Sequence, residues 1–158
     1  MRSKQTVLIL GLIFFLSTFF LNCNRERKKE NQFVEAMDSR TKIRYRQYMV
    51  IGKRLYKQHC ANCHGENGEG LEQLYPPLAK SDYLMEDIER AICQIRYGIE
   101  GEITVNGISY NQEMVGHDDL RPLNIAEIIT FITNSWGNEK GLVSAKDVEQ
   151  VLSRCMQN

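Results

Sequence analysis

The sequence predicts a mainly helical domain that carries one short β-hairpin. Apolar side chains recur at the spacing of an amphipathic helix in four stretches, near residues 48–59, 82–97, 124–134 and 144–156. A period-two pattern spans residues 102–110, where Asn106-Gly107 interrupts the alternation as a tight hairpin turn does. The length of 158 residues suits one domain of ordinary size with extensions, and no internal repeat is found. The predicted fold class is therefore all-α with a small hairpin.

An export segment opens the sequence. Residues 1–4 supply positive charge, and residues 7–21 are almost unbroken apolar sequence, which is typical of a signal peptide. The stretch Phe20-Leu21-Asn22-Cys23 resembles the lipobox of bacterial lipoproteins, in which the cysteine is lipidated and becomes the mature N-terminus, although Asn22 departs from the usual small residue. We predict a lipoprotein-type signal at residues 1–22, with an uncleaved membrane anchor as the alternative. Either one places the remaining chain outside the cytoplasm, on the periplasmic side, and ties it to a membrane.

Charge is distributed unevenly along a chain whose formal net charge is zero. Residues 25–54 hold ten basic and four acidic residues, whereas residues 55–158 hold eight basic and sixteen acidic ones. The acidic main body argues against nucleic acid as a partner. Residues 23–46 are polar and charged with few apolar side chains, so they are predicted as a tether. A folded domain at 47–138 and a helical extension at 139–158 complete the predicted organisation.

The folded domain is predicted to begin near Tyr48 with a helix whose apolar face is formed by Val50, Ile51, Leu55 and Tyr56. The glycine-rich stretch 65–70 follows this helix and lacks the Lys-Ser/Thr pair of a phosphate-binding loop. Tyr75-Pro76-Pro77-Leu78 then predicts a rigid, extended corner.

Three further helices are predicted from caps and apolar stripes. Ser81 or Asp82 caps a helix that runs through about Tyr97. Asn124 and Glu127 resemble a capping box at the start of a helix that ends near residue 134, and the last helix spans about 144–156. Residues 111–120 have no regular period and are predicted to be irregular.

The motif Cys60-Ala61-Asn62-Cys63-His64 carries the most specific chemistry in the chain. Two thiols separated by two residues and followed at once by an imidazole are the pattern of covalent haem c attachment, with Cys60 and Cys63 on the vinyl groups and His64 on the iron. A zinc site would need a second ligand pair, and the rest of the sequence has none at that spacing. A redox dithiol would need a buried strand before the first cysteine, whereas a helix is predicted there.

Residues 48–138 resemble a class I c-type cytochrome. Gly52-x-x-x-Tyr56 is similar to the family's first helix, whose glycine permits a close crossing with the last helix, and Phe131 sits where the family has an aromatic on that crossing. The resemblance implies three to five helices wrapped round one covalently bound haem, with the hairpin near 102–110 as a small insertion.

The resemblance also implies further haem-binding residues. Pro76-x-Leu78 resembles the family's loop in which a proline carbonyl accepts the N–H of the axial histidine, and Pro76 is favoured over Pro77. Such a bond would fix the tautomer of His64 and raise its basicity. Pro76 and Leu78 are therefore assigned to the haem-binding site.

Met114 is predicted as the second axial ligand of the iron. In a similar subgroup of the family, the methionine four residues after the tyrosine that corresponds to Tyr110 is that ligand. Met114 also falls in the irregular segment, where a loop can fold over a haem face. The rival ligand is His117, and His59 is assigned a structural role. Val115-Gly116 replaces the proline that often follows the ligand, which predicts a less stiff loop.

Five cysteines then have to be placed. Cys23 is assigned to lipid and two cysteines to haem, which leaves Cys93 and Cys155. Two thiols in an oxidising compartment are candidates for a disulfide. The alternative is two separate, half-buried thiols.

These residues predict a membrane-tethered electron carrier rather than an enzyme. Histidine and methionine fill both axial positions, so the iron has no open site for a substrate. The expected partners are redox proteins of membrane complexes, and neither nucleic acid nor a small-molecule substrate is expected. The alternatives are a dedicated haem subunit of a dehydrogenase or reductase complex and, with Met114 off the iron, a ligand-binding sensor or peroxidatic haem.

Overall fold

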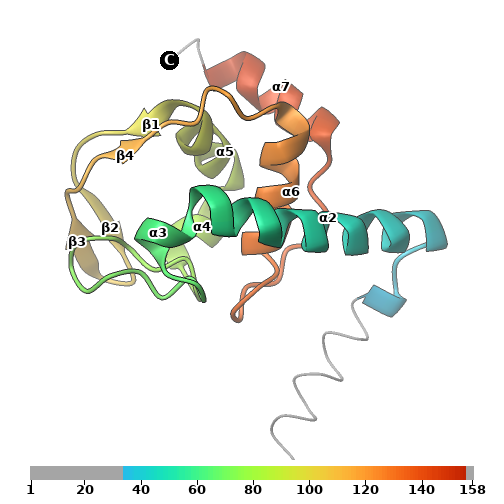
Figure 1. The fold of residues 1–158 in the computed structure, drawn as a ribbon, viewed down its shortest axis with the longest axis horizontal. Helices are drawn as coiled ribbons and strands as arrows, with labels where there is room; N and C mark the ends of the chain where they lie inside the picture. The colour runs from blue at the N-terminus through green and yellow to red at the C-terminus, as the bar shows by residue number, and fades with distance from the viewer. Residues whose placement is uncertain (1–33, 156–158) are drawn as a thin grey trace, which may run out of the picture. The chain divides into compact units, whose positions relative to one another are not determined.

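The computed structural model describes residues 34–155 (Figure 1). The predicted signal at 1–22, Cys23 and the first part of the tether lie outside the described residues. Within the described range no helix is long and apolar enough to cross a membrane. The chain divides into two units after Lys42, and the second unit, which starts at Ile43, contains the hydrophobic core. This unit is mainly helical, as the sequence predicted, and it contains two small two-stranded sheets where one hairpin was expected.

Helix α2 (Ser39–His59) starts earlier than predicted and takes in the end of the proposed 23–46 tether. Its first backbone N–H groups are satisfied by the Asp38 carboxylate, which accepts hydrogen bonds from Arg40 at 3.0 Å and Thr41 at 3.1 Å. A hydrogen bond from the Thr41 side chain, together with these backbone bonds, lowers the pKa of Asp38 below its usual range. The start of this helix was not predicted because its first two turns are polar and have no apolar stripe, although Tyr45 is buried.

Helices α2 and α6 (Pro122–Ile132) cross closely, and α6 stands steeply across α2 in Figure 1. A Cβ atom on Gly52 would lie only 2.0 Å from the carbonyl oxygen of Glu127 and 2.8 Å from the Cβ of Phe131. Any larger residue at position 52 would therefore push the two helices apart. The predicted role of Gly52 in the crossing is confirmed.

Three aromatic rings pack together at this crossing and stabilise it. The ring of Tyr56 lies 5.5 Å from that of Phe131 and 5.1 Å from that of Trp136, and the last two lie 5.2 Å apart. These centroid distances are in the favourable range for tilted and edge-to-face pairs. The Tyr56 hydroxyl also donates to the carbonyl oxygen of Gly65, so the cluster reaches into the loop after the motif.

Helix α6 begins two residues before the predicted capping box. Its N-cap is Arg121, and Pro122 occupies the first helical turn, where its missing N–H costs nothing. Asn124 acts within the helix instead, because its side-chain oxygen accepts a hydrogen bond from the Arg121 backbone N–H at 3.3 Å.

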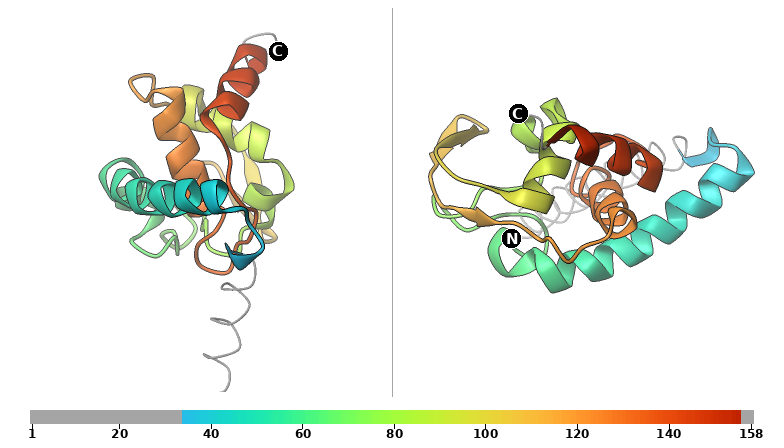
Figure 2. Two further views of the ribbon diagram at one scale, coloured as in Figure 1. Left: turned by 90° about the vertical axis from the view of Figure 1, so that its right-hand side faces the viewer. Right: turned by 90° about the horizontal axis from the view of Figure 1, so that it is seen from above.

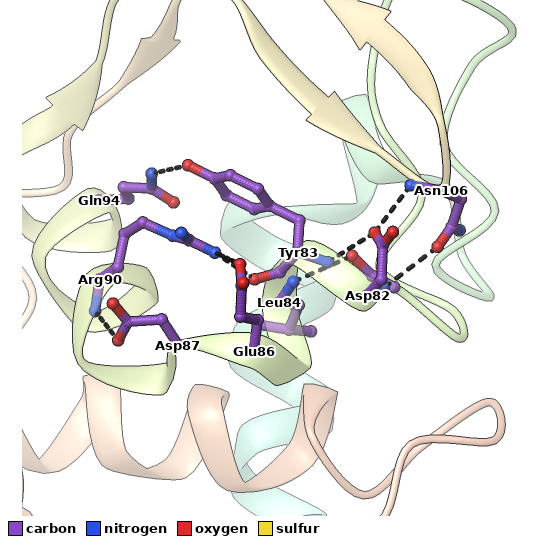
Figure 3. A network of polar contacts seen from close by, with 9 residues as sticks. Asp82, Tyr83, Leu84, Glu86, Asp87, Arg90, Gln94 and Asn106 are labelled. Atoms are coloured by element: carbon purple, nitrogen blue, oxygen red, sulfur yellow. Dashed lines mark hydrogen bonds and ion pairs between the residues drawn. The ribbon is translucent and has the colours of Figure 1, made fainter.

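The helix predicted between residues 82 and 97 is two helices, α4 (Asp82–Glu86) and α5 (Ile88–Tyr97). Asp87 breaks the run with extended backbone and then caps α5, accepting from the Arg90 backbone N–H at 2.9 Å. Ser81 caps α4 as predicted, through a 3.1 Å bond from the Leu84 N–H. Figure 3 shows how the two pieces are tied together, since the Arg90 side chain donates to the Tyr83 carbonyl oxygen at 2.6 Å.

Both small sheets involve the segment between α5 and α6. Strands β2 (Ile103–Val105) and β3 (Ile108–Tyr110) form the predicted hairpin, with positive φ at Asn106 and Gly107. The Asp82 carboxylate accepts from the Asn106 N–H at 2.7 Å and so anchors the turn to α4 (Figure 3). Strands β1 (Gly98–Ile99) and β4 (Met114–Val115) form the second, unpredicted sheet.

The C-terminal helix α7 (Ala145–Cys155) packs against α5 and α6, which Figure 2 shows from two sides. Val148 and Val151 are buried there with Ile92 and Ile128. A disulfide joins Cys155 of α7 to Cys93 of α5, so the two cysteines left over in the sequence are paired.

Candidate haem site

The haem-attachment motif forms one helical turn, α3 (Ala61–His64), directly after α2. Cys60 stands at its N-cap, and its carbonyl oxygen accepts from the backbone N–H groups of Cys63 at 3.1 Å and His64 at 3.0 Å. Residues three and four positions apart lie on the same side of a helix, so the turn brings the two thiols and the imidazole to one side. Both thiols are free.

His64 is held by a single defined hydrogen bond. Its Nδ1 lies 2.9 Å from the carbonyl oxygen of Pro76. A carbonyl can only accept, so Nδ1 carries the proton and Nε2 keeps its lone pair for a metal. Burial lowers the pKa of His64, partly offset by the bond to Pro76, which favours the neutral ring that coordination requires.

The loop that presents Pro76 is fixed by its glycines. The carbonyl oxygen of Gly68 accepts from the backbone N–H groups of Leu78 and Ala79 at 2.8 and 2.9 Å. A Cβ on Gly68 would meet the Trp136 ring at 2.5 Å, and one on Gly70 would meet the Tyr75 carbonyl oxygen at 2.4 Å. The glycine-rich stretch 65–70 is therefore a tight loop that packs against the aromatic cluster.

Leu78 lies next to this glycine-rich loop. Its carbonyl oxygen accepts a 2.8 Å bond from the Asn138 side chain, which also donates to the Ile132 carbonyl oxygen. Leu78 is half-buried and packs on the core.

Met114 lies in strand β4 and not in an irregular segment. It pairs with Ile99 of β1, while Gly98 approaches the Met114 carbonyl so closely that a Cβ there would lie 2.4 Å from that oxygen. The backbone N–H of His117 donates to the Ile95 carbonyl oxygen at 2.9 Å. The loop expected to be less stiff is thus attached to β1 before Gly116 and to α5 after it, and Met114 is half-buried against the core.

The two remaining histidines contact each other, which the sequence did not indicate. The rings of His59 and His117 stand edge to face with centroids 5.4 Å apart. They come from the end of α2 and the segment after β4, and their 58-residue separation in sequence left no signal of the contact. His117, the predicted rival ligand, thereby has a structural contact of its own.

The residues present fit a covalently bound haem better than the other uses of such a motif. Burial, with the neighbouring Cys63, raises the pKa of the Cys60 thiol to about 12, whereas a redox dithiol needs a lowered pKa. No group of three or more His, Cys, Asp or Glu side chains within residues 34–155 could hold a metal ion, which leaves no zinc site there. Two side chains of the motif pack half-buried against the core, as do four apolar side chains from elsewhere: Cys60, Ala61, Leu78, Met85, Met114 and Trp136.

Comparison with known proteins supports the same cofactor. A family model described as cytochrome c matches residues 49–136. The chain belongs to the cytochrome c family. Haem c is the covalent cofactor of this family, electron transfer rather than enzymatic catalysis is its activity, and its members are typically extracytoplasmic. Helix α7 lies beyond the matched residues.

Individual relatives include cytochromes c-552 and the cytochrome c subunit of an enzyme. Cytochrome c-552 of Thermus thermophilus is 36% identical over 93 residues, which cover 56% of this chain and 70% of the relative. A second cytochrome c-552 of the same species is equally similar, and the match covers 62% of that relative. The cytochrome c subunit of a quinone alcohol dehydrogenase from Gluconobacter oxydans is 27% identical over 103 residues. That match covers 63% of this chain and only 21% of the subunit.

Proposed function

We propose that this cytochrome c is a membrane-tethered mono-haem carrier that passes single electrons between respiratory-chain proteins. In this proposal Cys60 and Cys63 form the haem thioethers, and His64 and Met114 are the axial ligands. The observation that carries the assignment is the 2.9 Å bond from His64 Nδ1 to Pro76, because it leaves Nε2 as the one ring nitrogen able to coordinate iron. Haem c, when bound, supplies an iron that cycles between ferric and ferrous states by one electron.

The chain's own residues would keep this site closed and rigid. The Pro76 carbonyl orients the imidazole, and the pairing of β4 with β1 holds the Met114 segment in place. A thioether in the second axial position excludes substrates and raises the reduction potential relative to a second nitrogen ligand. Fixed ligands on both sides also limit the rearrangement that accompanies each electron transfer.

Tethering is proposed from the sequence alone. A signal at 1–22, lipidation of Cys23 and a charged segment through residue 46 would hold the 47–138 domain and its 139–158 extension at a membrane on the periplasmic side. Three acyl chains on one cysteine would anchor stably, since each buried methylene contributes about 0.8 kcal/mol. The domain would then meet membrane-bound donors and acceptors at raised local concentration.

A dedicated subunit of a dehydrogenase complex is the second candidate. It is favoured by the similarity to a quinone alcohol dehydrogenase cytochrome c subunit and by α7, which adds surface beyond the family match. Affinity purification from solubilised membranes separates the two. A carrier is recovered without a stoichiometric enzyme, whereas a subunit brings its enzyme with it.

The absorption spectrum of the full, haem-loaded protein tests the closed site. A carrier with thioether ligation shows the far-red charge-transfer band of the ferric form, and its reduced form does not bind carbon monoxide. A five-coordinate spectrum that shifts on addition of carbon monoxide would instead assign the protein to the ligand-binding haem sensors.

A further inference from the structure

Helix α2 has a solvent face that buries nothing in the domain. Its buried residues Leu55, Tyr56, Gly52 and Tyr45 share one side at about 100° per residue. Ile43 and Val50 lie seven residues apart on the opposite side, 58% and 72% exposed. Two large apolar side chains so far out of the core form a row that the fold itself does not use.

Cations surround this apolar row. We define the outer face of α2 as Ile43, Arg46, Val50, Lys53, Arg54 and Lys57, all of them exposed. The helix Ser39–His59 contains seven Lys and Arg residues and no Asp or Glu. Lys57 contacts Glu66 at 3.0 Å, but both side chains are exposed and such a pair contributes little.

We propose that the outer face of α2 rests on an anionic lipid surface. Exposed branched apolar side chains set among Lys and Arg are the composition of a helix that lies in the headgroup layer, with each cation attracted to anionic lipid. An acidic protein would pair with the cations but would gain little from Ile43 and Val50. The apolar run at residues 7–21 lies little more than twenty residues before Ile43, so the proposal rests on the tethering proposed above.

A separation of charge within the domain would set the orientation. The loops at 65–75 and 98–119 contain eight Asp and Glu residues and no Lys or Arg. They flank the proposed ligands His64 and Met114, whereas α2 is basic throughout. Glu66 of the first loop contacts Lys57 at the C-terminal end of the outer face, so the charges are separated least there. On an anionic membrane the rest of the outer face is attracted and the acidic loops are repelled, so the haem edge would tilt away from the lipid toward a partner.

The test follows the chemical accessibility of Val50 in the full, haem-loaded chain. The proposed lipid, thioether and disulfide bonds use the other five cysteines, so Val50→Cys supplies the one thiol that a water-soluble maleimide can alkylate. We expect alkylation to be at least about fivefold slower in nanodiscs of phosphatidylcholine with phosphatidylglycerol than in phosphatidylcholine alone. Ile108→Cys, on the hairpin, is the control and should react at the same rate in both lipids.

Charge variants test the cations. Arg46→Gln with Lys53→Gln should restore the alkylation rate of Val50→Cys in anionic nanodiscs, because two cations contribute roughly 10- to 30-fold to surface association. Lys140→Gln with Lys146→Gln removes the same charge from another surface and should leave the protection intact.

The outcomes also separate this proposal from the tether. Co-sedimentation with neutral vesicles reports the anchor, and lipid-dependent alkylation reports α2. Equal alkylation in both lipids by a protein that sediments with both would overturn the α2 proposal and keep the tether. A chain that sediments with anionic vesicles only, and dissociates in salt, would keep α2 and overturn the anchor. Protection that needs native membranes and is absent with pure lipid would assign this face to an acidic protein, against the proposal.

Discussion

His64 Nδ1 and the carbonyl oxygen of Pro76 lie 2.9 Å apart, although the two residues are twelve positions apart in sequence. That bond depends on the backbone path of the loop between them, which Gly70 sets with φ of +72°. Replacement of Gly70 by alanine should displace the loop, because the new Cβ would stand 2.4 Å from the Tyr75 carbonyl oxygen. We expect a loss of about 2–4 kcal/mol in the free energy of unfolding and a change in reduction potential.

Gly101→Ala is the matched control for this prediction. Gly101 also has positive φ, at +90°, but has no atom within 4 Å of its added Cβ. The Gly101→Ala variant should lose only about 1–2 kcal/mol of its free energy of unfolding, from backbone strain, and its reduction potential should stay unchanged. Equal effects of the two substitutions on the potential would contradict the role given to the loop.

Gly52→Ala should be among the most damaging single substitutions in the domain. The added methyl would overlap the Glu127 carbonyl oxygen at 2.0 Å, and backbone cannot move aside as a flexible side chain can. We expect the free energy of unfolding to fall by about 3 kcal/mol or more, which would be measured as a lower denaturation midpoint or a reduced yield of haem-loaded protein. Val50→Ala, on the exposed side of the same helix, should change stability by less than about 0.5 kcal/mol. An unchanged midpoint for Gly52→Ala would rule out the close crossing.

The Cys93–Cys155 disulfide closes a loop with a sequence separation of 62 residues. Its removal in the Cys93→Ser, Cys155→Ser double variant should cost about 2–5 kcal/mol. Cys93 lies on α5, and β1, which follows α5, pairs with the strand that contains Met114. Loss of the disulfide should therefore also weaken the pairing of β1 with β4. Chemical denaturation of the oxidised, reduced and double-variant proteins measures the cost. Identical midpoints for all three would show that α7 is held by packing alone.

Glu127 predicts a specific pH dependence of stability. Burial raises its pKa above the usual 4.5, partly offset by Asn124 and by the charges of Arg54 and Arg121. The folded protein therefore holds this proton more tightly than the unfolded chain, and the free energy of unfolding falls as pH rises from about 4.5 through the raised pKa. Glu127→Gln should remove that decline and be the more stable form at neutral pH. Glu149 is exposed on α7, so Glu149→Gln should keep the decline. A Glu127→Gln curve parallel to that of the wild-type protein would contradict the assignment.

The helices and the haem motif were predictable because each carries a local signal. The Asn106-Gly107 turn and the Ser81 cap each have a conformational reason that acts within a few residues. Gly52 contacts Glu127 far along the chain, so its role was predicted through the family resemblance instead. The break at Asp87 was missed because the stripe of Ile88, Ile92 and Ile95 continues without a change of period into the preceding turn.

Other features carried no sequence signal at all. Strands β1 and β4 have two residues each, too few to show a period, so their pairing could not be predicted. The contact between His59 and His117 depends on how α2 and the segment after β4 are brought together in three dimensions. The bond from His64 to Pro76 was thus predictable, whereas the strand that contains Met114 was not.

The most direct test of the account is the ferric spectrum of Met114→Ala beside Met85→Ala. Both methionines are half-buried on the same core, so the two variants remove similar packing, and only Met114 is proposed to bind iron. We predict that Met114→Ala loses the far-red band and that its reduced form binds carbon monoxide, while Met85→Ala keeps the band and excludes the gas. A Met114→Ala spectrum identical to that of the wild-type protein would contradict the closed site and move the second ligand elsewhere, first to His117.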